Sequence, residues 1–294
     1  MTKLLLPALA GFLLAASRLC GAVQPSGIHN HTYGIEMADH TVVLTLDDGP
    51  GPMTVPIGYY LYTKGIQATF FEEGCRYSRD LAPDPAPPAK PGDIGSCDND
   101  TNYNRSVLYA LNSYGHILGN HTQNHILMNT GATDYCGNPY SNTQRIAEVL
   151  GWGSNLQYLL PAHHRYYRSP GFSWDAETAA LLNSAWDPVD RTYSIYERYR
   201  GPISADIGDF YVGNGENGDV GCWNKNNDLS VSACAQMFID DIVNNGNRGI
   251  IIFHDRPVTA PDGKSEYALI QQIVTWLEEN DFRIVSLDSL PIPQ

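Results

Sequence analysis

Two adjacent carboxylates, Asp47 and Asp48, follow a short apolar run and precede a glycine and a proline. The run at residues 41–44 is rich in β-branched side chains, which predicts a buried strand, and Gly49 with Pro50 predicts a turn. Neighbouring side chains on an extended backbone point to opposite faces, so both acids can enter one pocket only where the strand is broken. An isolated Asp-Asp-Gly sequence is more often a solvated turn, so the pair indicates chemistry only together with partners elsewhere.

His121 and His125 are such partners, because two imidazoles four residues apart share one face if their segment is helical. Both can then reach one metal ion. With one carboxylate they would form a His-His-Asp site that leaves coordination positions open for water and substrate. The spacing alone arises by chance, but its combination with Asp47 and Asp48 indicates a metal centre.

Three later groups of polar residues also follow strand-like runs. They are Arg168-Ser169-Pro170-Gly171-Phe172, Asp187-Pro188-Val189-Asp190 and Ile252-Phe253-His254-Asp255. Each residue taken singly has a simpler interpretation: Arg168 as half of a surface ion pair, Asp190 as part of a turn, and His254 as a buried core histidine. Their common placement after strands indicates instead that they contribute to one site.

The elements that must position these residues alternate between strands and helices. Strands are expected at residues 41–44, 67–71, 116–120, 166–168, 185–189, 249–253 and 282–287. Helices are expected at residues 54–64, 104–114, 141–150, 174–183, about 231–245 and 265–279. The expected amino-terminal caps are Ser141, whose capping-box partner is Gln144, then Ser173, and Ser230 or Asp228.

This alternation predicts an α/β fold in which about seven parallel strands close into a barrel or near-barrel with outer helices. Chemistry in such folds lies at the carboxyl ends of the strands, which is where the five polar groups fall.

In these motifs the sequence resembles the polysaccharide deacetylases of the NodB-homology type, carbohydrate esterase family 4. Thr45 to Pro50 is similar to the family's T-F-D-D-G-P motif, and His121 to His125 matches H-[ST]-x-x-H. The resemblance implies a distorted (β/α) barrel of the NodB-homology type. It also implies a catalytic domain over residues 30–290. The proline-rich stretch at residues 83–91 cannot pack as a regular element, so we expect it to be a surface insertion in that domain.

The resemblance further implies roles for individual residues. Asp47 is the implied catalytic base and His254 the acid that protonates the leaving group. The implied ligands of a divalent metal, usually zinc, with cobalt, nickel or manganese as alternatives, are Asp48, His121 and His125. Arg168, paired with Asp190, is implied to orient Asp47.

Four positions depart from the family motifs. Leu46 replaces phenylalanine, Gly171 stands where R-x-P-Y has tyrosine, Arg191 replaces the tryptophan of D-x-x-D-W, and Ile252 replaces the leucine of L-x-H. Gly171 keeps the backbone N–H that the family uses at the oxyanion, although the groove wall loses a ring. The departures fall on substrate-lining positions rather than on proton or metal positions.

Composition restricts the partners. The 294 residues include 18 basic and 32 acidic ones, a formal charge of −14, which argues against nucleic acid or an anionic membrane surface. A neutral polysaccharide or oligosaccharide fits better. The chain has no internal repeat and no second apolar span long enough for a membrane helix, and we expect one monomeric catalytic unit.

The amino-terminal residues predict export. Lys3 precedes an apolar run at residues 4–16, so residues 1–19 are interpreted as a secretory signal peptide whose boundary lies between residues 17 and 22. We expect an extracellular or cell-wall protein with disulfides among Cys75, Cys97, Cys136, Cys222 and Cys234, and also Cys20 if cleavage precedes it. Glycosylation is expected at Asn30, Asn99 and Asn104, but not at the sequon of Asn120, which adjoins the histidine motif.

Together these inferences predict a secreted, metal-dependent deacetylase that hydrolyses N-acetyl groups of chitin or N-acetylglucosamine oligomers and releases acetate. Two alternatives stay open: an acetylxylan esterase acting on O-acetyl groups, and a catalytically weak secreted carbohydrate-binding protein.

Overall fold

The computed structural model describes residues 36–77, 105–133, 137–159, 166–185, 199–212, 216–223, 227–255 and 266–290. Several predictions lie outside these residues: the signal peptide, the proline-rich insertion, the strand at residues 185–189 beyond Ala185, and the residues Cys20, Asn30, Cys97, Asn99, Asn104, Cys136, Asp187, Asp190 and Arg191. No helix in the described ranges is long and apolar enough to cross a membrane.

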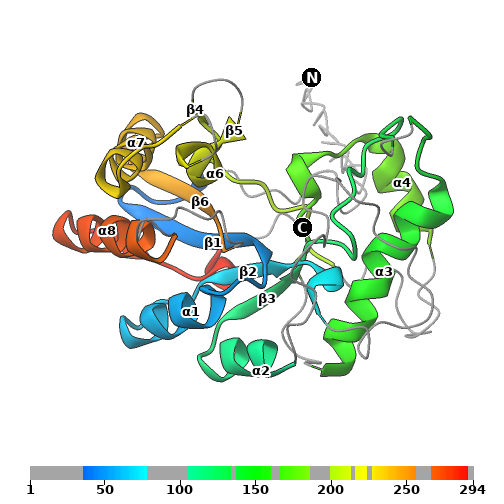
Figure 1. Ribbon diagram of the computed structural model, residues 1–294, viewed down its shortest axis with the longest axis horizontal. Helices are drawn as coiled ribbons and strands as arrows, with labels where there is room; N and C mark the ends of the chain where they lie inside the picture. Colours follow the sequence, from blue (N-terminus) through cyan, green and yellow to red (C-terminus); the bar gives the residue numbers. More distant parts are fainter. Residues whose placement is uncertain are drawn as a thin grey trace, which may run out of the picture.

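A parallel sheet forms the centre of the molecule (Figure 1). Its strands are β1 (Thr41–Gly49), β2 (Thr69–Glu72), β3 (Ile117–Asn120), β6 (Arg248–His254) and β7 (Arg283–Ile284). The order is β3-β2-β1-β6, and β7 pairs with the first two residues of β1, before the pairing of β1 with β2 begins at Thr45. The parallel α/β architecture is therefore confirmed.

Single bridges extend this sheet on both sides. Tyr167 pairs with Asn120 at the end of β3, Tyr166 pairs with Arg200, and Ile207 pairs with Ile251 in β6. The segment 200–207 thus reaches from the β3 side of the sheet to β6, as in a distorted barrel. Of the predicted strands, the one at residues 166–168 contributes isolated bridges through Tyr166 and Tyr167 instead of a full strand. Residues 200–207, where no strand was predicted, contribute bridges in the same way.

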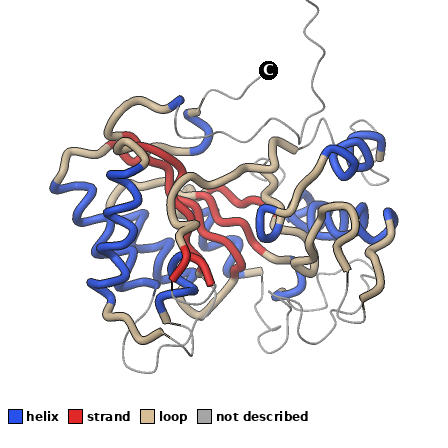
Figure 2. The backbone as a smooth tube through the Cα atoms, turned by 90° about the horizontal axis from the view of Figure 1, so that it is seen from above, coloured by secondary structure: helices blue, strands red, loops and turns tan. Residues whose placement is uncertain are grey.

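Helices lie on both sides of the strands (Figure 2). They are α1 (Thr54–Thr63), α2 (Ser106–Ser113), α3 (Asn142–Leu159), α4 (Ala176–Ser184), α6 (Gly218–Cys222), α7 (Val231–Asn244) and α8 (Glu266–Glu279). Short 3-10 turns are η2 (Gly74–Arg76), η4 (Pro170–Phe172) and η5 (Leu287–Ser289). Helix α6 and the antiparallel pair β4 (Tyr211–Val212) and β5 (Glu216–Asn217) were not predicted from the sequence.

Two of the predicted caps are confirmed and one is wrong. Ser230 accepts a hydrogen bond from the backbone N–H of Ala233, and the Ser141 hydroxyl accepts one from the N–H of Gln144, whose side chain returns to the Ser141 N–H. Helix α4 begins two residues later than expected because Asp175, not Ser173, accepts from the third N–H of the helix.

The pleat of β1 separates the hydrophobic core into two layers. Val42, Leu44 and Leu46 belong to the cluster that also contains the buried faces of α1, α7 and α8, whereas Val43 belongs to a second cluster with Phe71 and Ile250. Alternation places the next odd-numbered residues, Thr45 and Asp47, on the side of the second cluster. Asp47 therefore lies at the carboxyl end of β1, on the same face of the sheet as the second cluster.

Candidate active site

A bulge at the end of β1 brings Asp47 and Asp48 into one buried site. The register of β1 against β2 shifts between Asp47 and Gly49, and Asp48 has a left-handed backbone conformation with φ of 67°. This bulge breaks the alternation of side chains, as the sequence analysis required for two adjacent acids. The strand itself ends later than predicted, since β1 continues through both acids to Gly49.

The side chains of Asp48, His121 and His125 converge on one point. Asp48 Oδ1 lies 3.2 Å from His121 Nε2 and 3.0 Å from His125 Nε2, and all three residues are buried. Ligands about 2.0–2.1 Å from a tetrahedral ion lie roughly 3.3 Å apart, so these separations fit a shared metal ion. Two imidazoles and one carboxylate are also a donor set that zinc accepts.

The histidine motif is not helical, which corrects one premise of the sequence analysis. Thr122 and His125 have φ values of 70° and 54°, and the segment is an irregular loop after β3. His121 Nδ1 lies 2.9 Å from the carbonyl oxygen of Arg168 and donates to it, which leaves Nε2 free to act as a ligand. The convergence of the two imidazoles therefore comes from loop geometry and not from the helical repeat.

The two neighbouring histidines, His121 and His125, favour the ionised form of the Asp48 carboxyl group. Burial alone would raise the pKa of Asp48, but the neighbouring His125 and His121 hold it well below its usual value. Burial likewise lowers the pKa of His125, and the Asp48 carboxylate outweighs this and raises it. A proton on His125 would compete with a cation, because a histidine ligand must be neutral.

Glu148 of α3 holds the histidine loop, a role that was not predicted from the sequence. Its two carboxylate oxygens accept from the backbone N–H of Asn124 at 2.6 Å and from the Asn124 side chain at 2.7 Å. The Glu148 carbonyl also accepts from the N–H of Gln123 at 2.9 Å. Burial raises the pKa of Glu148 to about 7, against the effect of these donors. A glutamate on an amphipathic helix gives only a weak signal in the sequence, because no neighbouring residue indicates that it is buried or which group it binds.

Arg168 is fully buried and binds Asp47 directly. Its Nη1 donates to Asp47 Oδ1 at 2.7 Å and to Thr45 Oγ1 at 2.8 Å, while Nε and Nη2 donate to the carbonyls of Ile203 and Ser204. The guanidinium also lies over the Phe71 ring, 4.4 Å from its centroid. These contacts fix one carboxylate oxygen of Asp47, and the other lies 3.7 Å from His121 Nε2. The predicted partner Asp190 lies outside the described residues.

His254, at the end of β6, has a partner that the sequence did not reveal. Asp219 of α6 accepts from His254 Nδ1 at 2.7 Å with one oxygen and from the His254 backbone N–H at 2.7 Å with the other. Burial alone would lower the pKa of His254, but Asp219, with smaller contributions from Asp48 and Asp47, raises it to about 10. The imidazole is therefore protonated at neutral pH, and Nε2 is the nitrogen left for substrate.

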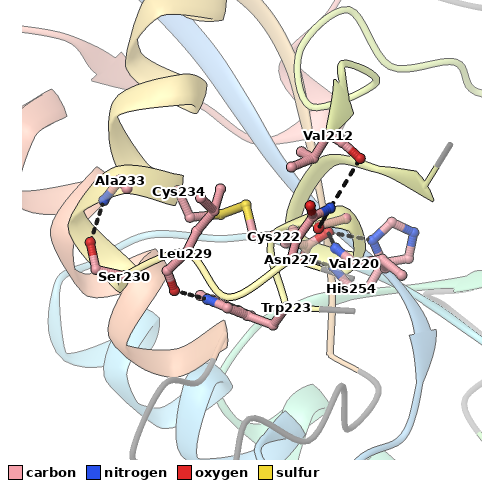
Figure 3. The surroundings of a disulfide bond; sticks show 12 residues. Val212, Val220, Cys222, Trp223, Asn227, Leu229, Ser230, Ala233, Cys234 and His254 are labelled. Carbon is pink, nitrogen blue, oxygen red and sulfur yellow. Dashed lines mark hydrogen bonds and ion pairs between the residues drawn. A yellow bond between two sulfur atoms is a disulfide. The ribbon is translucent and has the colours of Figure 1, made fainter. Parts of the chain in front are cut away.

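A disulfide fastens α6 beside this pair. Cys222 at the end of α6 is bonded to Cys234 of α7, and Figure 3 shows the bond and His254 in one view. This confirms one of the expected disulfides. Cys75 is also disulfide-bonded, and its partner lies outside the described residues, since Cys222 and Cys234 bond to each other.

The substrate-lining predictions have mixed outcomes. Gly171 lies in η4 with φ of 54°, where a side chain is strained, and an added Cβ would approach Leu127 to 3.3 Å. Its neighbour Phe172, which the sequence analysis did not weigh, lies 5.7 Å from the Arg168 guanidinium. A ring is therefore present one residue after the family's tyrosine position. Ile252 is buried in β6, and its backbone N–H donates a hydrogen bond to the carbonyl oxygen of Ile207.

Two further buried acids lie behind the Asp47–Asp48 bulge. Tyr77 donates to Glu72 Oε2 at 2.8 Å, and Thr54 donates to Asp255 Oδ2. A Cβ at Gly49 would meet oxygens of both acids at 2.5–2.8 Å, so any larger residue there would displace the two carboxyl groups that approach the bulge. Burial raises the pKa of Asp255 to about 7. Burial and the nearby charge of Asp255 raise the pKa of Glu72 well above its usual value.

The expected lack of glycosylation at Asn120 stays a prediction, and the place of the residue in the fold supports it. The residue is fully buried, and its side-chain amide donates to the Val149 carbonyl and to the Tyr199 hydroxyl. An amide so engaged is closed to modification in the folded protein.

Comparisons with known proteins identify the family of the chain. The family model described as "Polysaccharide deacetylase" matches residues 34–185. Among solved structures, the chitin deacetylase from the fungal pathogen Colletotrichum lindemuthianum is similar at 18% identity and a TM-score of 0.59, covering 90% of this chain and 91% of that one. No curated protein sequence matches.

Two bacterial structures are also similar. The catalytic domain of a peptidoglycan N-acetylglucosamine deacetylase from Eubacterium rectale has 14% identity and a TM-score of 0.56, covering 90% of this chain and 96% of that one. A family 4 pseudoenzyme from Bacillus anthracis has 14% identity and a TM-score of 0.54, covering 90% and 69%. At these identities the structures show a common fold. Because the family model covers more than half of the sequence, the chain belongs to the polysaccharide deacetylase family.

Proposed function

We propose that this protein is a metal-dependent N-deacetylase that releases acetate from chitin or from N-acetylglucosamine oligomers. One observation carries the proposal: the three candidate metal ligands lie beside a carboxylate held by arginine and near a histidine held by aspartate. A base and an acid next to a metal site are what hydrolysis of an unactivated amide requires.

Asp48, His121 and His125 would hold the divalent ion, with zinc favoured by the donor set and cobalt, nickel or manganese as alternatives. When bound, such an ion polarises a carbonyl and makes water more acidic. The orientation of His121 by the Arg168 carbonyl means that the protein prepares this ligand in advance.

Asp47 is proposed to accept the proton of the attacking water. Arg168 occupies one of its oxygens at 2.7 Å, which orients the carboxylate, and the second oxygen faces the histidine pair. Thr45 joins Arg168 to the carbonyl of Ile251, so the arginine is itself fixed from two strands. The base can therefore act without a prior rearrangement of its side chain.

His254 is proposed to protonate the leaving nitrogen. An amine anion is a poor leaving group, so an amide needs this proton more than an ester does. The hydrogen bond of Nδ1 to Asp219 leaves Nε2–H as the donor, and the raised pKa keeps the proton in place at neutral pH. This charged acid favours the N-deacetylase over the acetylxylan esterase.

At the oxyanion and along the substrate-lining surface, Gly171 and Ile252 depart from the residue types of the family motifs. We propose that the N–H of Gly171 donates to the oxyanion and that Ile252 and Phe172 contribute apolar surface near the acetyl group. We further propose that the protein acts as a monomer outside the cell. The signal-like amino terminus and the Cys222–Cys234 disulfide support export.

The test is release of acetate from chitin oligomers and from acetylated xylan, side by side, with and without a chelator. The proposal expects release from the chitin oligomers that disappears on chelation and returns when zinc is added. Asp47→Asn is the control for contaminating activity. Faster release from xylan would favour the esterase, and no release from either polymer would favour a binding protein without catalysis.

A further inference from the structure

Three tyrosines from two helices form a cluster on the outer surface of the protein. Tyr59 and Tyr62 of α1 are 54% and 51% exposed, and Tyr114 follows the end of α2. The Tyr62 and Tyr114 rings are stacked, with centroids 5.4 Å apart and an interplanar angle of 25°. Tyr59 lies 5.6 Å from Tyr114 and 6.4 Å from Tyr62. We name these three residues the tyrosine platform.

Close packing of α1 on α2 creates this platform. A Cβ at Gly58 would approach Leu111 Cδ2 to 2.6 Å, so the glycine lets the two helices come together. His116 Nε2 donates to the Gly58 carbonyl at 2.8 Å, and its Nδ1 accepts from the N–H of Ala68. The buried framework beneath the rings therefore holds the backbone at Tyr114 close to the end of α1, which brings the three rings within contact of one another.

The platform lies at the end of the barrel opposite to the candidate active site. Helix α1 leaves the carboxyl end of β1 and returns to the start of β2, so Tyr59 and Tyr62, in its last two turns, lie near the amino ends of the strands. Tyr114 similarly lies just before β3. Figure 1 shows α1 and α2 together on one side of the sheet, and β4 with α6 on the other.

The two helices beneath the platform carry no charged side chain. Helices α1 and α2 contain no Asp, Glu, Lys or Arg, although the whole chain carries 50 such residues and a net charge of −14. The adjacent Lys64 is neutralised by Glu278 at 2.6 Å. An uncharged surface of this kind does not repel or attract ions, and it matches a neutral ligand better than an anionic one.

Tyrosine rings suit a sugar chain chemically. The face of an aromatic ring carries partial negative charge, and the axial C–H groups of an equatorially linked pyranose are weakly positive, so the two surfaces stack. The tyrosine hydroxyls can add hydrogen bonds that leucine or phenylalanine would not offer. Exposed aromatic patches in a soluble protein commonly mark binding sites.

From these observations we infer that the tyrosine platform is a second, non-catalytic binding site for a neutral, β-linked polysaccharide. The inference rests on the proposed function in that both sites would act on one polymer. A second attachment point would hold the enzyme on an insoluble substrate and raise the local concentration of acetylated chain at the active site.

The experiment measures adsorption of the full-length protein to insoluble chitin, and to cellulose as a second surface, at low and high salt. The variant Tyr59→Ala/Tyr62→Ala should adsorb about tenfold more weakly, given the usual worth of two aromatic contacts. Tyr59→Phe/Tyr62→Phe should retain most of the binding. Tyr211→Ala removes a tyrosine that is 71% exposed on β4 and should bind like the wild type.

Acetate release from soluble oligomers should be the same in all four proteins, because none of these residues lies at the active site. Unchanged adsorption of the double alanine variant, or no adsorption of the wild type, would overturn the inference. Self-association in the ultracentrifuge that the same variant abolishes would identify the platform as a dimer interface and would also overturn it. Adsorption is measured without turnover, so its outcome is independent of whether the proposed deacetylation is found.

Discussion

His254 and Asp219 form a two-point contact in which one carboxylate binds both the imidazole and the backbone N–H of the same residue, each at 2.7 Å. The contact joins the carboxyl end of β6 to α6, two elements separated by the whole of α7. Since the carboxylate fixes the ring and its tautomer together, the direction in which Nε2 faces is set by a helix that carries no other candidate catalytic residue.

The first prediction follows from this contact. A general acid must be protonated, so activity should fall as pH rises through the pKa of His254, which is raised to about 10. A bound cation would offset the charges of Asp47 and Asp48, so the alkaline limb of kcat/KM is expected at or somewhat below that pH. Asp219→Asn should move this limb downward by about 1 to 3 pH units. Asp240→Asn, on the exposed face of α7, is the control and should not move it.

A second prediction separates the adjacent acids from each other and from the histidines. His125→Ala should lose both the metal and activity, because the site loses one of three protein ligands. Asp47→Asn should lose turnover and keep nearly the wild-type metal content, because Asp47 contacts Arg168 and is proposed as a base. Zinc stoichiometry after dialysis measures both. Loss of zinc from Asp47→Asn would require Asp47 to be a ligand. The matched control is His40→Ala, because this histidine lies outside the site and its side chain is 43% exposed.

A third prediction concerns the support of the histidine loop by Glu148. Glu148→Ala removes the acceptor of two Asn124 donors and should weaken zinc affinity by about 10- to 100-fold, the usual effect of losing a group that orients ligands. Glu148→Gln keeps one acceptor and should lose less. Competition with a chromophoric chelator gives the affinity without an activity assay. Glu177→Ala, on the exposed surface of α4, should leave it unchanged, and equal affinity in Glu148→Ala would remove the role.

A fourth prediction tests whether His254 is the acid. His254→Ala should reduce hydrolysis of N-acetylglucosamine oligomers by about 10² to 10⁴-fold and hydrolysis of an aryl acetate much less, because an aryloxide leaves without protonation. Initial rates on both substrates supply the comparison. Equal losses would mean that His254 stabilises the site or the oxyanion, and the acid assignment would then be abandoned while the metal site stands.

A fifth prediction uses the buried carboxyl groups of Asp255 and Glu72. The pKa of Asp255 is raised from 3.8 to about 7, so the folded state holds a proton that the unfolded chain releases. This contribution to stability is complete below about pH 4 and is lost as pH rises through about 7, with a limit of about 4 kcal/mol. Asp255→Asn cannot ionise, and its amide can donate to Glu72.

Urea unfolding of chelated wild type and Asp255→Asn at pH 5 and pH 8 measures this effect. The variant should gain stability relative to the wild type between the two pH values. Use of chelated protein removes the metal-linked titration of Asp48 and His125 from the comparison. The same relative stability at both pH values would show that the pair does not titrate in this range.

Local sequence patterns determined most of the secondary structure and the chemical types in the site. The β-branched run of β1, the apolar run of β6 and the capping residues at Ser141 and Ser230 each act within a few positions, so they can be identified without a fold. The ligand set Asp48, His121 and His125 was also predictable, because each residue follows a strand and parallel strands end at one edge of the sheet.

Tertiary structure alone decided how these residues are held. Asp47 and Asp48 enter one buried site through a bulge defined by pairing with β2, and the histidine loop is held in its shape by Glu148 and not by helical spacing. Asp219 and His254 are 35 positions apart, and Gly58 matters only because Leu111 packs against it. Hydrogen bonds and close packing between distant segments leave no periodic trace in the sequence, because their partners are chosen by the fold and not by chain neighbours.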